Sequence, residues 1–352
     1  MAGLERSISS FLFFLKDISS INTSFMNKTQ RRKRDMSFCL LSALGSLSPT
    51  GHLVVAVCLG FIGTFGFLNN LLVLTLFCRY HTLRSPINVL LLSVCVSDLL
   101  VCVLGTPFSF AAATQGRWLI GRAGCVWYGF INACLGIVSL ISLAVLSYER
   151  CCTMLCRMQA DGTDFGTAVA GVCFSWVYAL AWTLPPLLGW SSYGPEGPGT
   201  TCSVDWRTQT PNNISYIVCL FTFCLLLPFS VIMYSYGKLL SAIKQVTNHR
   251  PLGQRVLVMV VTMVACYLLC WLPYGVAALL STFGPRNLLT PEVTIVPSLL
   301  AKTSTVINPV IYIYMNRQVL TLTHTHTLSH THTHPELLCG VVSLMFLPCV
   351  HA

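Results

Sequence analysis

Residues 299–312 read LLAKTSTVINPVIY, inside an apolar or weakly polar segment that runs from Val293 to Met315. Its one charged residue, Lys302, lies close to the middle. The segment is about long enough to cross a bilayer, since a transmembrane helix needs roughly 20 mainly apolar residues. A lysine at the bilayer centre costs about 2.5–3.5 kcal/mol even on the more lenient insertion scale. From mid-span its side chain does not easily reach water.

Lys302 therefore needs either a buried carboxylate partner on another helix or the loss of its charge. A neutral amine in an apolar pocket is a nucleophile that forms Schiff bases with carbonyl compounds. The first option makes Lys302 a structural residue, and the second makes it a covalent attachment site. Cost and position alone leave both options open.

The composition places the chain in a membrane. Of its 352 residues, 54% are hydrophobic and only 9% are charged, whereas a soluble domain carries about 25% charged residues. The apolar segments lie at about residues 52–77, 87–112, 124–148, 166–189, 214–236, 256–281 and 292–315. Several contain proline, which transmembrane helices tolerate because neighbouring groups satisfy the freed carbonyls. We therefore expect an all-α membrane protein, a bundle of seven transmembrane helices.

The distribution of basic residues indicates the orientation. With the N-terminus outside, the inner loops hold nine Lys and Arg residues and the outer loops hold four, as the positive-inside rule requires. The RRKR run at residues 31–34 argues the other way, whereas sequons at Asn22 and Asn27 are consistent with an outer N-terminus. The net charge of +10 does not predict a nucleic-acid partner, because no basic stripe is interleaved with aromatic residues.

The chain divides into three parts. Residues 1–50 are expected to be a disordered extracellular tail, residues 51–318 the seven-helix domain, and residues 319–352 an atypical tail rich in His and Thr. Alternating His and Thr is typical of a metal-binding tract, but a CA dinucleotide repeat translated in frame produces the same pattern. We favour this second explanation, a gene-model artefact, and assign no metal site to the tail.

The 18 cysteines lie mostly in the apolar segments or near the cytoplasmic face. On the outer side, Cys125 at the start of the third segment and Cys202 in the loop after the fourth are well placed to pair, with Cys39 left over. A disulfide there fits an oxidising compartment and ties the loop over the bundle. The alternative is a pair of free thiols.

Polar motifs occupy particular places on the segments. The third ends in Tyr148-Glu149-Arg150, the sixth contains Cys270-Trp271-Leu272-Pro273-Tyr274, and the seventh contains Asn308-Pro309-Val310-Ile311-Tyr312. Single residues join them on the first, second, fourth and fifth segments: Asn70, Asp98, Trp176, Pro228 and Tyr236. Each motif alone is weakly specific, but in this order, from about residue 50 to 318, they resemble the rhodopsin-class G-protein-coupled receptors.

Within that class the chain resembles the opsins, since Lys302 precedes Asn308 by the six residues that mark them. The stretches most similar to the encephalopsins and teleost multiple-tissue opsins are GRWLIGRAGCVWYGF (116–130), GWSSYGPEGPGTTCSVDW (189–206) and CYLLCWLPYGV (266–276). The resemblance implies that retinal is bound to Lys302 as a Schiff base, as the 11-cis isomer in the dark. The other pocket positions that it implies are Gly136, Trp206, Trp271, which packs against the polyene, and Tyr274.

A protonated Schiff base in a dry pocket needs a counterion, since an isolated buried cation loses its proton. Many vertebrate visual opsins have a Glu three residues after the third-span cysteine, where this chain has Tyr128. The family's other counterion position, six residues before the loop cysteine, is Glu196 here. The resemblance makes Glu196 the counterion and Tyr128 its hydrogen-bonding neighbour. The alternative is that Glu196 is a solvated loop acid.

The same resemblance implies a receptor of the plasma membrane, not an enzyme. Isomerisation of retinal from 11-cis to all-trans activates a heterotrimeric G protein, and arrestin and a receptor kinase are further expected partners. The residues implied in the switch are Glu149, Arg150, Tyr236, Asn308, Pro309 and Tyr312. Asn70 and Asp98 would anchor a polar network of water, or of a sodium ion at Asp98.

Three other functions fit less of the sequence. A photoisomerase that does not signal is consistent with the absence of the family's amphipathic helix after Gln318, but Glu149-Arg150 and the Asn-Pro motif favour a receptor. A receptor for an amine typically has an Asp at the position of Asn132, and it lacks the lysine. A light-driven pump needs several intramembrane carboxylates, and the segments hold Asp98 and little more.

The chain departs from the family at its inner face. Cys151 replaces the Tyr of Glu-Arg-Tyr, a mild change. No acidic residue occurs between Asp205 and Glu292, so the sixth segment has no carboxylate to hold Arg150. Arg150 can still pair with the neighbouring Glu149, and we expect a weak inactive-state latch.

This weak latch predicts activity in the dark. Membranes that carry the chain without retinal should promote nucleotide exchange on a G protein above membranes that lack the chain, because fewer contacts hold the inactive state. Exchange at the background level, at matched protein amounts, would contradict the prediction.

Overall fold

The computed structural model describes residues 47–80, 83, 85–156, 165–245, 251–285 and 289–315. The two sequons, the RRKR run, Cys39 and the His/Thr tract all lie outside the described residues. The three-part division of the chain therefore stays a prediction at both ends.

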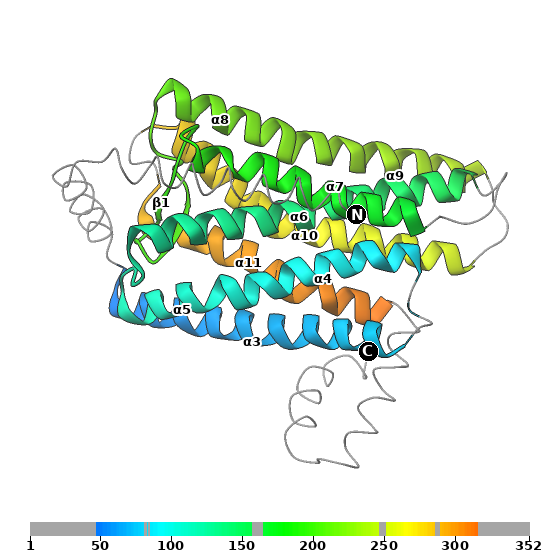
Figure 1. Cartoon of the computed structure of the whole chain (residues 1–352), viewed down its shortest axis with the longest axis horizontal. Helices are drawn as coiled ribbons and strands as arrows, with labels where there is room; N and C mark the ends of the chain where they lie inside the picture. The colour runs from blue at the N-terminus through cyan, green and yellow to red at the C-terminus, as the bar shows by residue number, and fades with distance from the viewer. Residues whose placement is uncertain are drawn as a thin grey trace, which may run out of the picture.

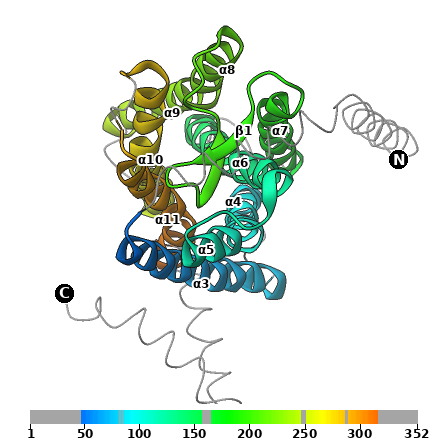
Figure 2. The ribbon, with the colours of Figure 1, turned by 90° about the vertical axis from the view of Figure 1, so that its left-hand side faces the viewer.

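Seven helical rods run side by side along the long axis of the molecule (Figure 1). Their helices are α3 (Pro49–Arg79), α4 (Pro86–Leu104) with α5 (Thr106–Gln115), α6 (Gly121–Cys156), α7 (Phe165–Thr183), α8 (Pro211–Phe221) with α9 (Leu227–Gln245), α10 (Pro251–Phe283) and α11 (Pro291–Met315). Viewed along the rods, α6 lies toward the inside of the bundle and contacts α4, α7, α9 and α10 (Figure 2). The predicted seven-helix bundle is confirmed.

The outside of the bundle suits a lipid environment. Large apolar side chains such as Leu53, Val57 and Phe61 on α3 are about 60% exposed: 64%, 63% and 58%. Six helical segments of the described chain are long and apolar enough to cross a membrane, and α11 is not one of them. Lys302 and the polar residues that follow it lower the mean hydropathy of α11, yet this helix packs among the others. The chain is a multi-pass membrane protein.

Proline and glycine residues account for the interruptions of the rods. The second rod breaks at Gly105. Pro107 supplies no backbone N–H to the helix, and the Val101 carbonyl accepts from the Gly105 backbone N–H at 3.0 Å and from the Thr106 hydroxyl at 3.2 Å. The predicted fourth segment ends earlier than expected, because α7 gives way to the 3₁₀ turn η2 (Pro185–Leu187) at two consecutive prolines.

The fifth rod contains a π-helical turn, η3 (Thr222–Leu226), between α8 and α9. Pro228 follows it and supplies no N–H to the carbonyl four residues earlier. Such turns shift the register of the residues that follow, and they are frequent at functional sites. The buried Cys224 of η3 lines the internal cavity described below.

A β-hairpin covers one end of the bundle (Figure 2). Its strands, β1 (Tyr193–Glu196) and β2 (Thr201–Val204), pair antiparallel, with Tyr193 opposite Val204 and Glu196 opposite Thr201. Two glycines of the connecting turn, Gly197 and Gly199, have φ of 58° and 77°, which L residues rarely adopt.

A disulfide joins this hairpin to α6. Cys125 and Cys202 have Cα atoms 5.4 Å apart and lie 77 positions apart in the sequence. Both are buried, beside Trp118 and Tyr128. The predicted disulfide is confirmed, and it fixes the hairpin, with Glu196 at the end of β1, above the interior of the bundle.

The disulfide predicts a loss of stability when it is removed. Replacement Cys202→Ser should lower the free energy of unfolding by up to about 4 kcal/mol, because the closed loop restricts the unfolded chain. The measurement is thermal unfolding in detergent, with Cys173→Ser on the exposed face of α7 as the matched control. Equal melting temperatures for the two variants would contradict the prediction.

Candidate functional site

An internal cavity opens between the helices below the hairpin. It is lined by residues of α4, α6, both strands of the hairpin, the fifth rod, α10 and α11. The volume open to the centres of water molecules is about 210 Å³. On the same measure a single water needs about 10–15 Å³. Its walls are mainly apolar and aromatic. The cavity therefore suits an elongated apolar ligand much larger than water.

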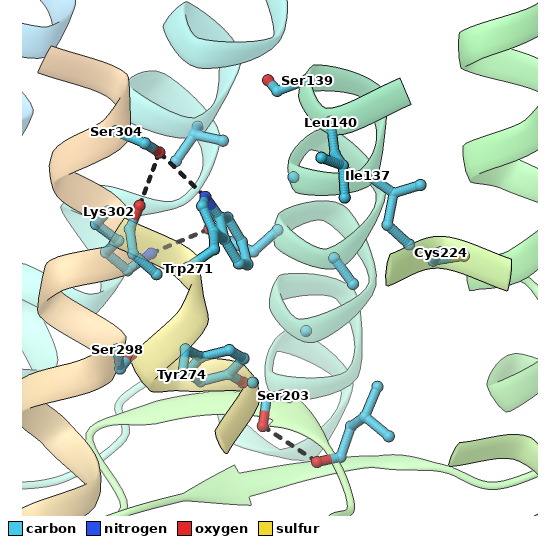
Figure 3. Close-up of a pocket in the computed structure, with 18 of the residues that line it drawn as sticks. Ile137, Ser139, Leu140, Ser203, Cys224, Trp271, Tyr274, Ser298, Lys302 and Ser304 are labelled. Atoms are coloured by element: carbon cyan, nitrogen blue, oxygen red, sulfur yellow. Dashed lines mark hydrogen bonds between the residues drawn. The ribbon is translucent and has the colours of Figure 1, made fainter. Parts of the chain in front are cut away.

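Lys302 lies in the wall of this cavity, on the fourth turn of α11 (Figure 3). Its Nζ donates a hydrogen bond to Oδ1 of Asn132 on α6 at 3.1 Å, and it lies 5.3 Å from the centre of the Tyr128 ring. Among the side chains that the structure describes, no carboxylate lies within ion-pair distance of this nitrogen. The structural alternative, a lysine paired directly with an acid, is not what these residues form.

Trp271 forms the inner wall of the cavity beside Lys302 (Figure 3). Its Nε1 donates to Oγ of Ser304 at 3.2 Å, and its ring stacks on Tyr267 with 5.6 Å between centroids. A Cβ added to Gly136 would lie 2.7 Å from Cη2 of this indole. The absence of a side chain at residue 136 therefore lets the indole lie directly against the backbone of α6.

Glu196 faces the cavity from the end of β1. Burial raises the pKa of its carboxyl above the ordinary value, and contacts with the Tyr274 and Ser203 side chains, together with the charge of Lys302, act in the opposite direction. The residue is half-buried and lines the cavity. Glu196 is therefore a cavity residue, and the alternative of a solvated loop acid does not fit its surroundings.

Aromatic hydroxyl groups connect the hairpin to the helices. The fully buried Tyr128 accepts a hydrogen bond from the Thr201 hydroxyl at 3.2 Å. The Nε1 of Trp206 donates to the hydroxyl of Tyr274, also at 3.2 Å. The structure thus brings Tyr128, Trp206 and Tyr274 to one end of the same cavity.

The expected polar network lies deeper in the bundle. Asp98 accepts hydrogen bonds from Ser139 at 3.2 Å and from Asn308 at 2.9 Å. Asn70 donates to the Thr305 carbonyl at 2.8 Å and so ties α3 to α11. In the described ranges, no group of three or more His, Cys, Asp or Glu residues could hold a metal ion. A sodium ion at Asp98 stays a prediction.

The residues of the expected switch gather at the opposite end of α6. Tyr236 shares a hydrogen bond with Ser147 at 3.1 Å. Both carboxylate oxygens of Glu149 are buried and accept no hydrogen bond from the described residues, although the charge of the neighbouring Arg150 acts on this carboxylate. The pairing of Arg150 with Glu149 stays a prediction. Tyr312 is fully buried against Phe77, with ring centroids 6.0 Å apart.

Two site residues escaped sequence reasoning. Asn132 attracted notice only as the place where amine receptors have an acid, and Ser147 attracted none. The contact of Asn132 with Lys302 joins positions 170 residues apart. The sequence places both residues at a similar depth in their segments. It does not determine how each helix is rotated about its axis, and so it could not predict that the two side chains meet.

Known proteins resemble the chain over most of its length. The family described as 7 transmembrane receptor (rhodopsin family) matches residues 69–312. Pinopsin of Columba livia is 40% identical over 280 residues, which cover 77% of this chain and 80% of the relative. Opsin-3 of Mus musculus is 37% identical over 282 residues, which cover 77% of this chain and 70% of the relative.

A solved structure has the same fold. The crystal structure of squid rhodopsin superposes with a TM-score of 0.74 at 24% sequence identity, and the match covers 84% of this chain and 95% of that one. At this identity the likeness shows the fold alone.

The close packing of Trp271 on α6 predicts an effect of substitution. Gly136→Ala should lower the free energy of unfolding by about 1–3 kcal/mol, because the indole must move or strain. Gly237→Ala on α9, where a Cβ meets nothing within 4 Å, is the matched control and should stabilise the helix by up to about 1 kcal/mol. Thermal unfolding in detergent measures both, and shifts of the same sign would refute the packing argument.

Proposed function

The chain belongs to the opsins within the rhodopsin family of seven-transmembrane receptors, and on that premise we propose that it is a non-visual light receptor. In this proposal Lys302 binds retinal as a Schiff base, and light switches the chain to a form that activates a heterotrimeric G protein. One observation carries the proposal: Lys302 lines a large, mainly apolar cavity, and no carboxylate of the described part of the chain contacts its nitrogen directly.

The cavity residues fit such a chromophore. The walls hold aromatic and apolar side chains along most of the cavity, and the amine lies beside Trp271. The neutral amine of Lys302 would hold retinal as a Schiff base, with the aldehyde oxygen released as water, and the bound group would supply the response to light.

We assign the counterion role to Glu196. The position of its carboxyl at the cavity wall, and the influence of the Lys302 charge on its pKa, support this role. The other acid among the described residues that line the cavity is Asp98, which accepts hydrogen bonds from Ser139 and Asn308. Asp205, which follows the hairpin, accepts hydrogen bonds from Arg207 and Thr208 of its own loop. In a medium of low dielectric constant a carboxylate acts on a cation beyond contact distance. Glu196 therefore holds the proton on the Schiff base without a direct ion pair.

The switch uses residues on the inner side of the cavity. A ligand shifts a receptor only by the difference in its affinity for two states, and 11-cis and all-trans retinal differ in shape. Trp271, which lies on α10 two residues before Pro273, is the side chain on which a change in the shape of the bound group would act. Movement of the inner end of α10 then rearranges Tyr236 and Tyr312 near Arg150. The proposed setting is the plasma membrane, with arrestin and a receptor kinase as regulators.

Absorption spectroscopy tests the chromophore and its counterion together. The expressed chain with added 11-cis-retinal should give a visible band that light changes, and Lys302→Ala should give none. Glu196→Gln should lose the visible band at neutral pH in favour of a near-ultraviolet one, because without the negative charge the Schiff base loses its proton. Asp205→Asn is the control and should keep the band.

Three outcomes would contradict parts of the proposal. A visible band that survives Lys302→Ala would refute the assignment of Lys302 as the attachment site. A band that stays in place in Glu196→Gln at neutral pH would refute the assignment of Glu196 as the counterion. Equal nucleotide exchange on a G protein in light and in darkness, with a normal pigment present, removes the receptor function and leaves a retinal protein that does not signal.

A further inference from the structure

The direct partner of the Lys302 nitrogen is a neutral amide. Nζ donates to Oδ1 of Asn132 at 3.1 Å, whereas no carboxylate of the described residues forms an ion pair with it. Both groups line the same cavity. Since a protonated Schiff base keeps a single N–H, it has one hydrogen bond to give, and its acceptor is a separate matter from the counterion.

The Asn132 amide is held with its oxygen toward Lys302. Its Nδ2 donates to the Tyr128 carbonyl, one helical turn earlier on α6, at 2.8 Å. The reversed amide would place an NH₂ group against the ammonium and an oxygen against a carbonyl oxygen, and both contacts would be repulsive. The backbone of α6 therefore selects the orientation in which Asn132 is an acceptor.

The neighbouring rod leaves room for this amide. A Cβ added to Gly105 would lie 2.5 Å from Oδ1 and 3.0 Å from Nδ2 of Asn132, and 2.9 Å from the backbone carbonyl oxygen of Val101. Real Cβ atoms essentially never come as close as 2.5 Å, so a larger residue at 105 would displace the amide. Gly105 lies at the break between α4 and α5, where a residue without a side chain lets the amide reach α11.

We propose that Asn132 is a positioning residue that accepts the N–H of the protonated Schiff base on Lys302, with Gly105 supplying the space that it needs. This inference rests on the proposed function. Two residues then have separate roles toward the Schiff-base nitrogen. Glu196 on the hairpin supplies the negative charge, and Asn132 on α6 supplies the hydrogen-bond acceptor.

Loss of the acceptor should weaken the cationic form of the Schiff base. Hydrogen bonds to charged groups are stronger than those between neutral groups, so Asn132→Leu should move the alkaline midpoint of the visible band down by about one pH unit or more. The direction follows because the visible form is the protonated one, which exists below the midpoint. Asn132→Asp keeps an acceptor and adds a charge, so its midpoint should rise.

Gly105→Ala is the second variant, because its added Cβ crowds the amide while Asn132 is unchanged. The same Cβ lies 2.9 Å from the Val101 carbonyl oxygen, so thermal unfolding of this variant is measured as well. The variant should lower the midpoint as Asn132→Leu does. Gly237→Ala on α9 is the matched control and should leave the midpoint where it is. The other titratable groups of the cavity wall are Asp98, Tyr128, Glu196, Tyr216, Cys224, Tyr267 and Tyr274. All of them are the same in Asn132→Leu, Gly105→Ala and Gly237→Ala, so a shift shared by the first two variants and absent from the third points to the amide.

The double variant Glu196→Gln with Asn132→Asp gives an independent reading. A carboxylate in place of the amide lies at the position that contacts the nitrogen, so this chain should recover the visible band that Glu196→Gln alone loses. Recovery supports direct contact between residue 132 and the Schiff base.

Two results would overturn the inference. A normal pigment in Asn132→Leu and Gly105→Ala, with the alkaline midpoint of the unsubstituted chain, would exclude the hydrogen bond and leave the proposed function intact. Failure of the double variant to recover the band, while Asn132→Asp alone forms pigment, would exclude contact. A chain without substitutions that forms no pigment would instead refute the proposed function, and this inference with it.

Discussion

A cation in the middle of a membrane protein is the constraint on which this structure depends. Water would solvate the Lys302 ammonium, and neither lipid nor a packed apolar core can do so. The protein meets this requirement with an internal cavity, a neutral amide beside the nitrogen and a carboxylate on the hairpin. The tight core lies farther along the bundle, where Leu76, Val94 and Tyr312 are buried in one apolar cluster.

The arrangement of polar groups follows from that constraint. The disulfide helps to hold the hairpin across the end of the bundle, and Glu196 of this hairpin lines the cavity. Asp98, at the opposite end of the cavity, is satisfied by Ser139 and Asn308. Each acid is thereby engaged near one end of the cavity, and the stretch between them remains mainly apolar. The protein separates the chemistry at the nitrogen from the polar network that links α4 to α11.

Sequence reasoning recovered what depends on hydropathy and on short-range spacing. The seven rods follow from apolar length, and the pairing of Cys125 with Cys202 follows from their place on the outer side. Contacts between helices depend on how each rod is rotated, which hydropathy constrains weakly because lipid and core are both apolar. The contacts of Lys302 with Asn132, and of Ser147 with Tyr236, were missed for that reason. The break at Gly105 depends on backbone detail near Pro107 and was likewise not foreseen.

The close approach of Gly105 to Asn132 also limits the order in which the sequence can change. A side chain at 105 would clash with the amide as it stands and would also crowd the Val101 carbonyl oxygen, so a larger residue there requires both a smaller residue at 132 and a small shift of this backbone. The order in which residue 105 changes first passes through an intermediate with a steric clash. Substitutions at these two positions, which lie on different rods, are therefore coupled. Few orders of substitution would change both residues without a steric clash in between.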